Sequence, residues 1–207
     1  MKRPAYLLAV IVLCTTAATM AYGTQSQATE KTLQNLQTAF NGESNAHARY
    51  LAFATKADQE GYGQVASLFR AAARAEEIHA RNHGAEIKKL GGTPQAKVET
   101  PVVKSTKENL QTAIQGETYE RDTMYPEFRK QARDVYNMDA LRTINFASNA
   151  EAEHAILFTA AYQNLENMRS KSSTYYVCAV CGYTMKTAPD RSCRGCYSSE
   201  EKFEQVH

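Results

Sequence analysis

Two glutamate–histidine pairs in this chain have the spacing of a two-ligand metal clamp. Glu76 precedes His79 by three residues, and Glu151 precedes His154 by the same interval. Residues three apart lie on the same face of a helix, so each pair can direct a carboxylate and an imidazole to one point. Oxygen and imidazole donors without thiolate favour iron or manganese over a structural zinc ion. One such pair is common by chance, but two in one chain indicate a metal site.

The two pairs belong to an internal duplication. Residues 35–44 recur as 109–118, and residues 75–80 recur as 150–155. Each copy of the first segment carries a Gly-Glu unit, which adds Glu43 and Glu117 to the candidate ligands. Gly42 and Gly116 each cost roughly 1 kcal/mol in a helix interior. Their recurrence predicts a close approach of helices beside the metals, with simple inheritance from the duplication as the alternative.

The second half of the duplication carries one extra carboxylate. Glu120 follows Glu117 by one helical turn, whereas the matching position after Glu43 is Ala46. Buried carboxylates are very costly unless they are neutralised or paired, so this set of glutamates requires cations. We therefore expect two metal positions that are not equivalent.

Four other titratable residues lie close to these motifs. His47 and His83 fall near the same helical stripe, and a hydrogen-bonded histidine in the core is favoured over a ligand role. Glu77 and Glu153 fall off the stripe, which predicts surface charges exposed to solvent.

The cysteines form a second candidate metal site. Cys14 stands apart, and the other four form two Cys-x-x-Cys knuckles, at Cys178, Cys181, Cys193 and Cys196. Two knuckles with a short spacer predict a tetrahedral four-thiolate site, but their spacing does not distinguish zinc from iron. By themselves they favour a zinc ribbon. Disulfides are the alternative in an exported protein, although adjacent pairs make a poor stabilising framework.

Apolar periodicity predicts the elements that position these ligands. The expected helices cover residues 30–57, 64–90, 106–134 and 138–167. Gly61 and Gly63 break the first pair of helices, and Asn137 breaks the second. A long crossover containing Pro94 and Pro101 joins the two pairs. A four-helix bundle with one long crossover has ferritin-like topology, so we expect an all-α bundle followed by a small metal-binding β/loop domain.

The first 23 residues have the pattern of an export signal. Lys2 and Arg3 precede an apolar run over residues 7–14, and small residues follow. The run is short for a membrane span, which needs about 20 apolar residues, so a signal cleaved near residues 18–23 is favoured over an uncleaved anchor. Cys14 would leave with the signal. We therefore expect an exported, periplasmic protein with no membrane span in its mature form.

The net charge supports the same division. The chain carries a formal +2, and Lys2 and Arg3 account for it, because residues 1–23 contain no acidic residue. The remainder is neutral. A surface that binds nucleic acid needs a basic excess, so no nucleic-acid partner is expected.

Taken together, the motifs resemble the rubrerythrin family, in which a ferritin-like di-iron domain precedes a rubredoxin-like iron domain. The resemblance is carried by residues 42–44, 76–79, 116–117, 120, 124–126 and 151–154 and by the two cysteine knuckles. It implies a di-iron bundle over residues 24–168 and a rubredoxin-like domain over 169–207. It also implies iron, rather than zinc, in the four-cysteine site.

The resemblance further implies a peroxidase. Hydrogen peroxide would be reduced at the di-iron site, with electrons relayed from the four-cysteine iron and supplied by an unidentified donor protein. In the family one iron exchanges a histidine for the additional glutamate on oxidation, which here corresponds to His79 and Glu120. Tyr50 and Tyr125 match family tyrosines beside the metals. Family dimers place the small domain of one subunit near the di-iron site of another, so a homodimer is expected.

Three positions depart from the family pattern. Ala179 and Arg194 stand where the knuckles often carry proline, and Tyr197 follows the last cysteine where a small residue is common. These changes affect the loops that tune the redox potential rather than the ligation.

Two other functions remain open: a ferroxidase or iron-storage protein, which the terminal cysteine module disfavours, and a non-catalytic zinc-binding protein.

Overall fold

The structure is a computed structural model that describes residues 6–169 and 171–207, with side chains described for residue 27 and from residue 29 onward. The side chains of the expected export signal, residues 1–23, therefore lie outside this description, and the backbone from Tyr6 forms the start of the first helix. In the part of the chain that is described, no helix has the length and apolar character needed to cross a lipid bilayer.

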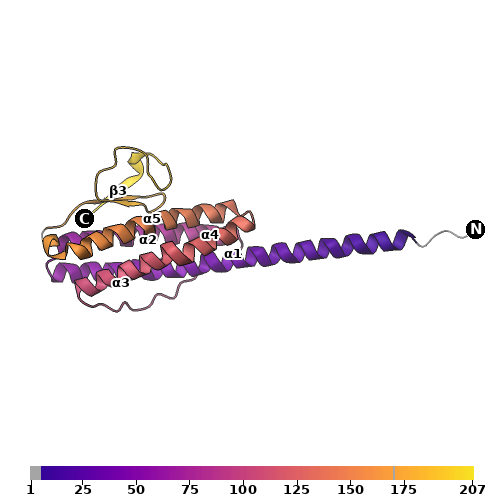
Figure 1. Ribbon diagram of the computed structural model, residues 1–207, viewed down its shortest axis with the longest axis horizontal. Helices are drawn as coiled ribbons and strands as arrows, with labels where there is room; N and C mark the ends of the chain where they lie inside the picture. The colour runs from indigo at the N-terminus through magenta and orange to yellow at the C-terminus, as the bar shows by residue number, and fades with distance from the viewer. Residues whose placement is uncertain (1–5, 170) are drawn as a thin grey trace, which may run out of the picture.

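The described part of the chain contains a helical bundle followed by a small domain (Figure 1). The α-helices are α1 (Tyr6–Gln59), α2 (Gly63–Lys89), α3 (Thr106–Tyr119), α4 (Tyr125–Asp134) and α5 (Met138–Gln163), and a 3-10 turn, η2 (Leu165–Met168), ends the bundle. The expected four-helix bundle with one long crossover is confirmed, with α3 and α4 together forming its third helix. The crossover, residues 90–105, runs along the outside of the bundle near α3 and α1.

Local signals set the helix ends. Gly61, at φ 79°, turns the chain between α1 and α2. Ser105 and Glu108 form a capping box at the start of α3. Asn137 separates the two helices of the second pair and caps α5, because its Oδ1 accepts from the backbone N–H of Ala140 at 2.9 Å.

The third helix contains a π-helical turn that the periodicity does not predict. This turn, η1 (Glu120–Met124), separates α3 from α4, and the N–H of Tyr125 donates to the carbonyl of Glu120. Pro126 is the physical reason: it has no N–H to donate to the carbonyl of Asp122, and in a regular α-helix its ring would crowd that carbonyl. The wider π-helical turn removes this conflict, and Glu120 is the first residue of that turn.

The core is divided into two apolar clusters with the ligand layer between them. One cluster contains the rings of Tyr50, Phe69 and Phe158, with Phe69 and Phe158 centroids 5.2 Å apart. The other contains Tyr125 and Ile144. On α1, α3 and α5 the candidate ligands fall between residues of the two clusters, and on α2 His79 does so, between Ile78 and Ile87. The bundle axis is therefore filled by apolar side chains on both sides of the site.

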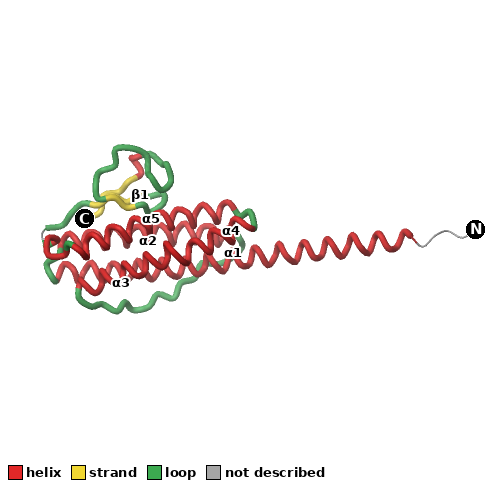
Figure 2. The backbone as a smooth tube through the Cα atoms, viewed as in Figure 1, coloured by secondary structure: helices red, strands yellow, loops and turns green. Residues whose placement is uncertain are grey.

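The small domain is a three-stranded antiparallel sheet with two loops. Its strands are β1 (Tyr175–Cys178), β2 (Thr184–Met185) and β3 (Phe203–Val206), in the order β2-β1-β3, and a 3-10 turn, η3 (Glu200–Lys202), precedes β3. Figure 2 shows this domain above α2 and α5, on the side of the bundle away from the crossover.

The small domain is fastened to its own bundle by apolar and charged contacts. Tyr175 and Val177 of β1 join the core cluster of the bundle. The guanidinium of Arg74 donates to both oxygens of Glu204, at 2.7 and 3.0 Å. Asn82 donates to the carbonyl of Val180 at 2.9 Å.

Candidate metal centres

Six of the seven candidate bundle ligands form two overlapping groups. The first group contains Glu43, Glu76, His79 and Glu151, and the second contains Glu76, Glu117, Glu151 and His154. Within each group the ligand atoms all lie within 4.8 Å of one another. Glu76 and Glu151 belong to both groups, so the arrangement fits two neighbouring ions joined by these two carboxylates. All six residues are buried.

The buried donor atoms test whether cations fit here. Several have no hydrogen-bond partner: Glu43 Oε2, Glu76 Oε1, Glu117 Oε2, both oxygens of Glu151, and His154 Nδ1. A buried polar atom without a partner costs about 1–3 kcal/mol, and a buried charge costs more. So many orphaned acceptors converging on two points are explained by bound cations. The residues present therefore fit a pair of metal ions.

Burial shifts the pKa values of these groups when no cation is bound. It raises the pKa of Glu117 to about 8, with a further contribution from Glu76. It also raises the pKa of Glu43, and Glu76 and Glu151 act in the same direction. Burial opposes the charged form of His79, but the neighbouring Glu151 raises the pKa of that imidazole above its usual value.

These shifts predict the pH dependence of the metal-free protein. A glutamate whose pKa is raised on folding stabilises the fold fully below its unfolded pKa, and the stabilisation is lost as pH rises through the folded value. For Glu117 that window runs from the ordinary value of 4.5 to about 8. The melting temperature of the metal-free protein is therefore expected to fall as pH rises across this window, by about 2–4 °C per kcal/mol lost.

Thermal melts of metal-free and iron-loaded protein between these limits check the expectation. The loaded protein should lack the fall, because metal binding requires deprotonated carboxylates and strengthens as pH rises. Parallel curves for the two forms would contradict it.

Two tyrosines donate hydrogen bonds to Glu43 and Glu117, the glutamates that belong to only one group each. The hydroxyl of Tyr50, on α1, donates to Glu117, and that of Tyr125, on α4, donates to Glu43. The structure thus places both predicted tyrosines directly against candidate ligands, each on a different helix from its partner. This exchange reflects the duplication of the helix pairs.

His83 extends one of these contacts. Its Nε2 lies 3.1 Å from the Tyr125 hydroxyl, and its Nδ1 lies 3.1 Å from Thr143 Oγ1. Because the Tyr125 proton goes to Glu43, Nε2 is the donor and Nδ1 accepts from Thr143. Burial lowers the pKa of His83 to about 3, consistent with this neutral form. The core role expected for His83 is what the structure shows, whereas Thr143 had no signal in the sequence.

Glu120 lies outside both groups. It is half-buried at the start of η1, and burial together with Glu43 and Glu117 raises its pKa well above the ordinary value. The structure therefore places His79, not Glu120, among the first group of ligand atoms. Glu120 remains close enough to the other carboxylates to be affected by their charge.

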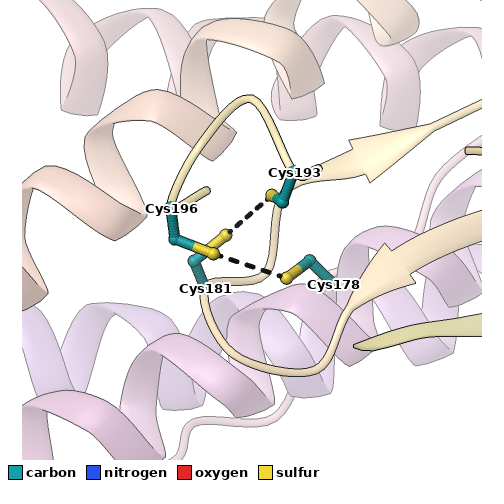
Figure 3. Close-up of side chains that lie close together, drawn as sticks. All are labelled: Cys178, Cys181, Cys193 and Cys196. Atoms are coloured by element: carbon teal, nitrogen blue, oxygen red, sulfur yellow. Dashed lines mark hydrogen bonds between the residues drawn. The ribbon is translucent and has the colours of Figure 1, made fainter. Parts of the chain in front are cut away.

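The four cysteines of the small domain converge on one point. Their sulfurs face one another between the two knuckle loops (Figure 3) and lie within 4.8 Å of each other. Cys181 and Cys193 have sulfurs 3.5 Å apart, and Cys178 and Cys196 have sulfurs 3.7 Å apart. All four are free, since a disulfide requires about 2.05 Å. The disulfide alternative is therefore wrong, and the cluster fits a tetrahedral ion.

Tyr197 shows why a small residue is common after the last cysteine. Its φ is 62°, in the left-handed region that favours glycine, and its ring is exposed. A side chain at such a backbone angle is strained. The knuckle keeps its turn despite the substitution.

The small domain supplies the outer partners of both ligand histidines. His79 Nε2 lies 3.0 Å from the carbonyl oxygen of Cys181, and His154 Nε2 lies 3.0 Å from Thr184 Oγ1. Thr184 in turn donates to the carbonyl of Gly182 at 3.1 Å. Each Nε2 therefore carries its proton and each Nδ1 faces the carboxylates. Such outer partners fix the orientation and tautomer of a metal-binding histidine.

Two sequence expectations about this region are corrected. Glu77 is exposed, as expected, but Glu153 is half-buried and accepts from the hydroxyl of Tyr183 at 3.0 Å, because the small domain docks over it. The close helix approach expected at Gly116 is also wrong. A Cβ added there would meet nothing within 4 Å, and at Gly42 it would meet only Glu120 Oε1, at 3.9 Å.

Comparison with known proteins identifies the family of this chain. The sequence model named Rubrerythrin matches residues 34–162, which is more than half of the chain. The chain belongs to the rubrerythrin family. Nigerythrin of Nitratidesulfovibrio vulgaris is 35% identical over 173 residues, covering 83% of this chain and 85% of that protein. Rubrerythrin-2 of Clostridium acetobutylicum is 37% identical over 172 residues, covering 82% and 93%.

Solved structures agree with this rubrerythrin assignment. Nigerythrin in its fully reduced, all-ferrous state superposes with a TM-score of 0.78 at 35% identity, covering 84% of this chain and 86% of that one. A bacterioferritin of Desulfovibrio desulfuricans reaches 0.64 at 22% identity over 69% of this chain, which shows the shared bundle fold alone. The chain is therefore a di-iron oxidoreductase of the peroxidase type, with a rubredoxin-like four-cysteine site.

Proposed function

We propose that this protein reduces hydrogen peroxide to water in its bundle, with electrons delivered through its four-cysteine domain. The reaction consumes two electrons and two protons for each H2O2 and releases two water molecules. Bound iron supplies the redox chemistry, one electron from each of the two ions in the bundle and one electron at a time through the four-cysteine ion.

The observation that carries this proposal is the contact between the two sites within one chain. Cys181 contributes a sulfur to the four-cysteine cluster, and its own carbonyl accepts from His79, a candidate ligand of the bundle site. One residue and one hydrogen bond thus connect the two groups of ligands. The resemblance implied that this approach occurs between subunits, whereas here the small domain lies on its own bundle.

The remaining residues hold the site for this chemistry. Glu76 and Glu151, shared by the two groups, keep both positions close together. Tyr50 and Tyr125 keep a proton within one hydrogen bond of Glu117 and Glu43. Gly182 and Thr184 close the α2–α5 face, since Thr184 is fully buried. We further propose that Glu120 replaces His79 in the first group when the site is oxidised.

Single-turnover kinetics test the proposed function against an iron-storage ferroxidase. The iron-loaded protein is reduced anaerobically and mixed with H2O2 or with O2, and the loss of the reduced state is followed by absorbance. We expect oxidation by H2O2 to be faster than oxidation by O2 by about 100-fold, the rate difference that a reactant misplaced by about 1 Å can produce. Faster oxidation by O2 would instead support the ferroxidase. Zinc in all sites would support a non-catalytic protein.

Three features of the cellular setting are also proposals. The protein is exported to the periplasm, receives electrons from a donor protein, and forms a homodimer. Cell fractionation with sequencing of the mature N-terminus tests the export, because a cytoplasmic protein that keeps Lys2 and Arg3 contradicts it.

Reduction of the four-cysteine ion by periplasmic extract tests the second proposal, the donor protein, and no reduction would contradict it. Sedimentation of the purified protein tests the third, and a monomer contradicts it.

A further inference from the structure

Peroxide must reach a site that is closed on several sides. Along the bundle axis, Phe158 and Ile144 belong to the two apolar clusters that fill the space on either side. On the α2–α5 face, Gly182 lies against the ring of His79, so that even an added Cβ would overlap it. α1 also packs along α2, and α3 packs along α5, whereas α1 and α3 make little direct contact.

A cleft of about 510 Å³ opens on this remaining face. Its walls come from α1, from α3 with η1, and from the crossover. Gly42, Gly116 and Glu120 are among its lining residues. Gly42 directly precedes the ligand Glu43, and Gly116 directly precedes the ligand Glu117. The cleft therefore reaches the backbone beside one ligand from each half of the duplication.

The two glycines are not explained by tight packing. An added Cβ would find open space at Gly116 and an ordinary contact at Gly42. Alanine at either position would favour the helix by roughly 1 kcal/mol. What the missing side chains do provide is room in the cleft, next to Glu120.

The crossover forms a fixed rim of this cleft. Asn41 Oδ1 accepts from the N–H of Lys97 at 2.9 Å, and Asn45 Oδ1 accepts from that of Glu99 at 2.9 Å. Asn45 also donates to the carbonyl of Lys97 at 3.0 Å. Both Lys97 and Glu99 line the cleft. The rim is thus held to α1 by side chains one helical turn apart.

We propose that this cleft is the entrance for peroxide, and that Gly42 and Gly116 keep it open. The inference rests on the proposed function and adds the route to the same site. Peroxide enters between α1 and α3, past Glu120, while electrons enter from the opposite α2–α5 face through Cys181 and His79. The two faces lie on opposite sides of the bundle, as the crossover and the small domain do in Figure 1.

Filling the cleft tests the proposal. Gly116→Leu is expected to slow the second-order oxidation of the reduced protein by H2O2 about 100-fold, because approach to the site is blocked. Gly116→Ala should slow the reaction far less than Gly116→Leu, because one methyl group occupies much less of the cleft than a leucine side chain. Gln115→Leu, at the neighbouring exposed position, controls for the added leucine.

A second variant and a second readout keep the test independent of folding and of turnover. Thr38→Trp adds a ring at an exposed position that also lines the cleft, so it narrows the entrance without disturbing the core. Both filling variants should slow the association of azide with the oxidised protein, at unchanged iron content and melting temperature.

The outcomes separate the two proposals. Wild-type protein that does not react with H2O2 contradicts the proposed function. Wild-type protein that reacts, together with filled variants that bind azide and react with H2O2 at the wild-type rates, overturns the entrance alone.

Discussion

Glu120→Ala is expected to slow oxidation of the reduced protein by H2O2 about 100-fold, the usual scale for losing one preorganised charged group. Oxidation adds two positive charges to the site, and Glu120 is the one candidate ligand that the structure leaves outside both groups. The side chain of Glu120 is half-buried. Burial is the largest cause of its raised pKa, and the nearby Glu43 and Glu117 raise the pKa further. A carboxylate that is repelled by neighbouring carboxylates can stabilise the oxidised site, because that site carries more positive charge.

Stopped-flow oxidation of the anaerobically reduced variant measures this effect. The fold should stay intact, because alanine is the better helix former and the variant removes a carboxylate whose burial is unfavourable. Glu127→Ala, an exposed glutamate in α4, is the matched control and should react as the wild type does. A near-normal rate for Glu120→Ala would remove Glu120 from the mechanism.

Gly182→Ala is expected to lower steady-state peroxide turnover about 100-fold, the loss that a misplacement of about 1 Å can produce. Gly182 has a φ of 80°, and an added Cβ would overlap the ring of His79. The small domain must then move away from the bundle, which separates the carbonyl of Cys181 from His79. Electron delivery should fail while both sets of ligands remain in the chain.

Two measurements separate this effect from general damage. Single-turnover oxidation of the fully reduced variant by H2O2 should fall much less than steady-state turnover, since it needs no electron delivery. Gly91→Ala is the matched control: Gly91 has a φ of 79°, and a Cβ there would meet nothing within 4 Å. It carries the same backbone strain without the contact. Equal turnover in Gly182→Ala and wild type would contradict a relay through this interface.

Much of the site was predictable because its ligands follow helical periodicity. Spacing places Glu76 beside His79 and Glu151 beside His154, and the duplication pairs Glu43 with Glu117. The structure brings all six together. The interruption at Glu120 was not expected, because periodicity assumes a regular helix. Pro126 was the available signal, since a proline inside a helix must disturb the preceding turn.

Gly116 shows the limit of a local argument. In the sequence its only known property is a missing side chain, which fits close packing and open space equally well. The structure decides for open space, because α1 and α3 make little direct contact and a cleft lies between them. Packing of distant helices determines this distance, and no residue near Gly116 encodes it.

The chain by itself therefore determined the donor types, their register along each helix, the topology of the bundle and the four-thiolate cluster, because periodicity and short spacing are local properties. Tertiary structure alone decided what lies around those donors. Cys181 meets His79, and Thr184 meets His154, only because the small domain docks on α2 and α5. These contacts join residues 102 and 30 positions apart, and such separations leave no periodic trace in a sequence.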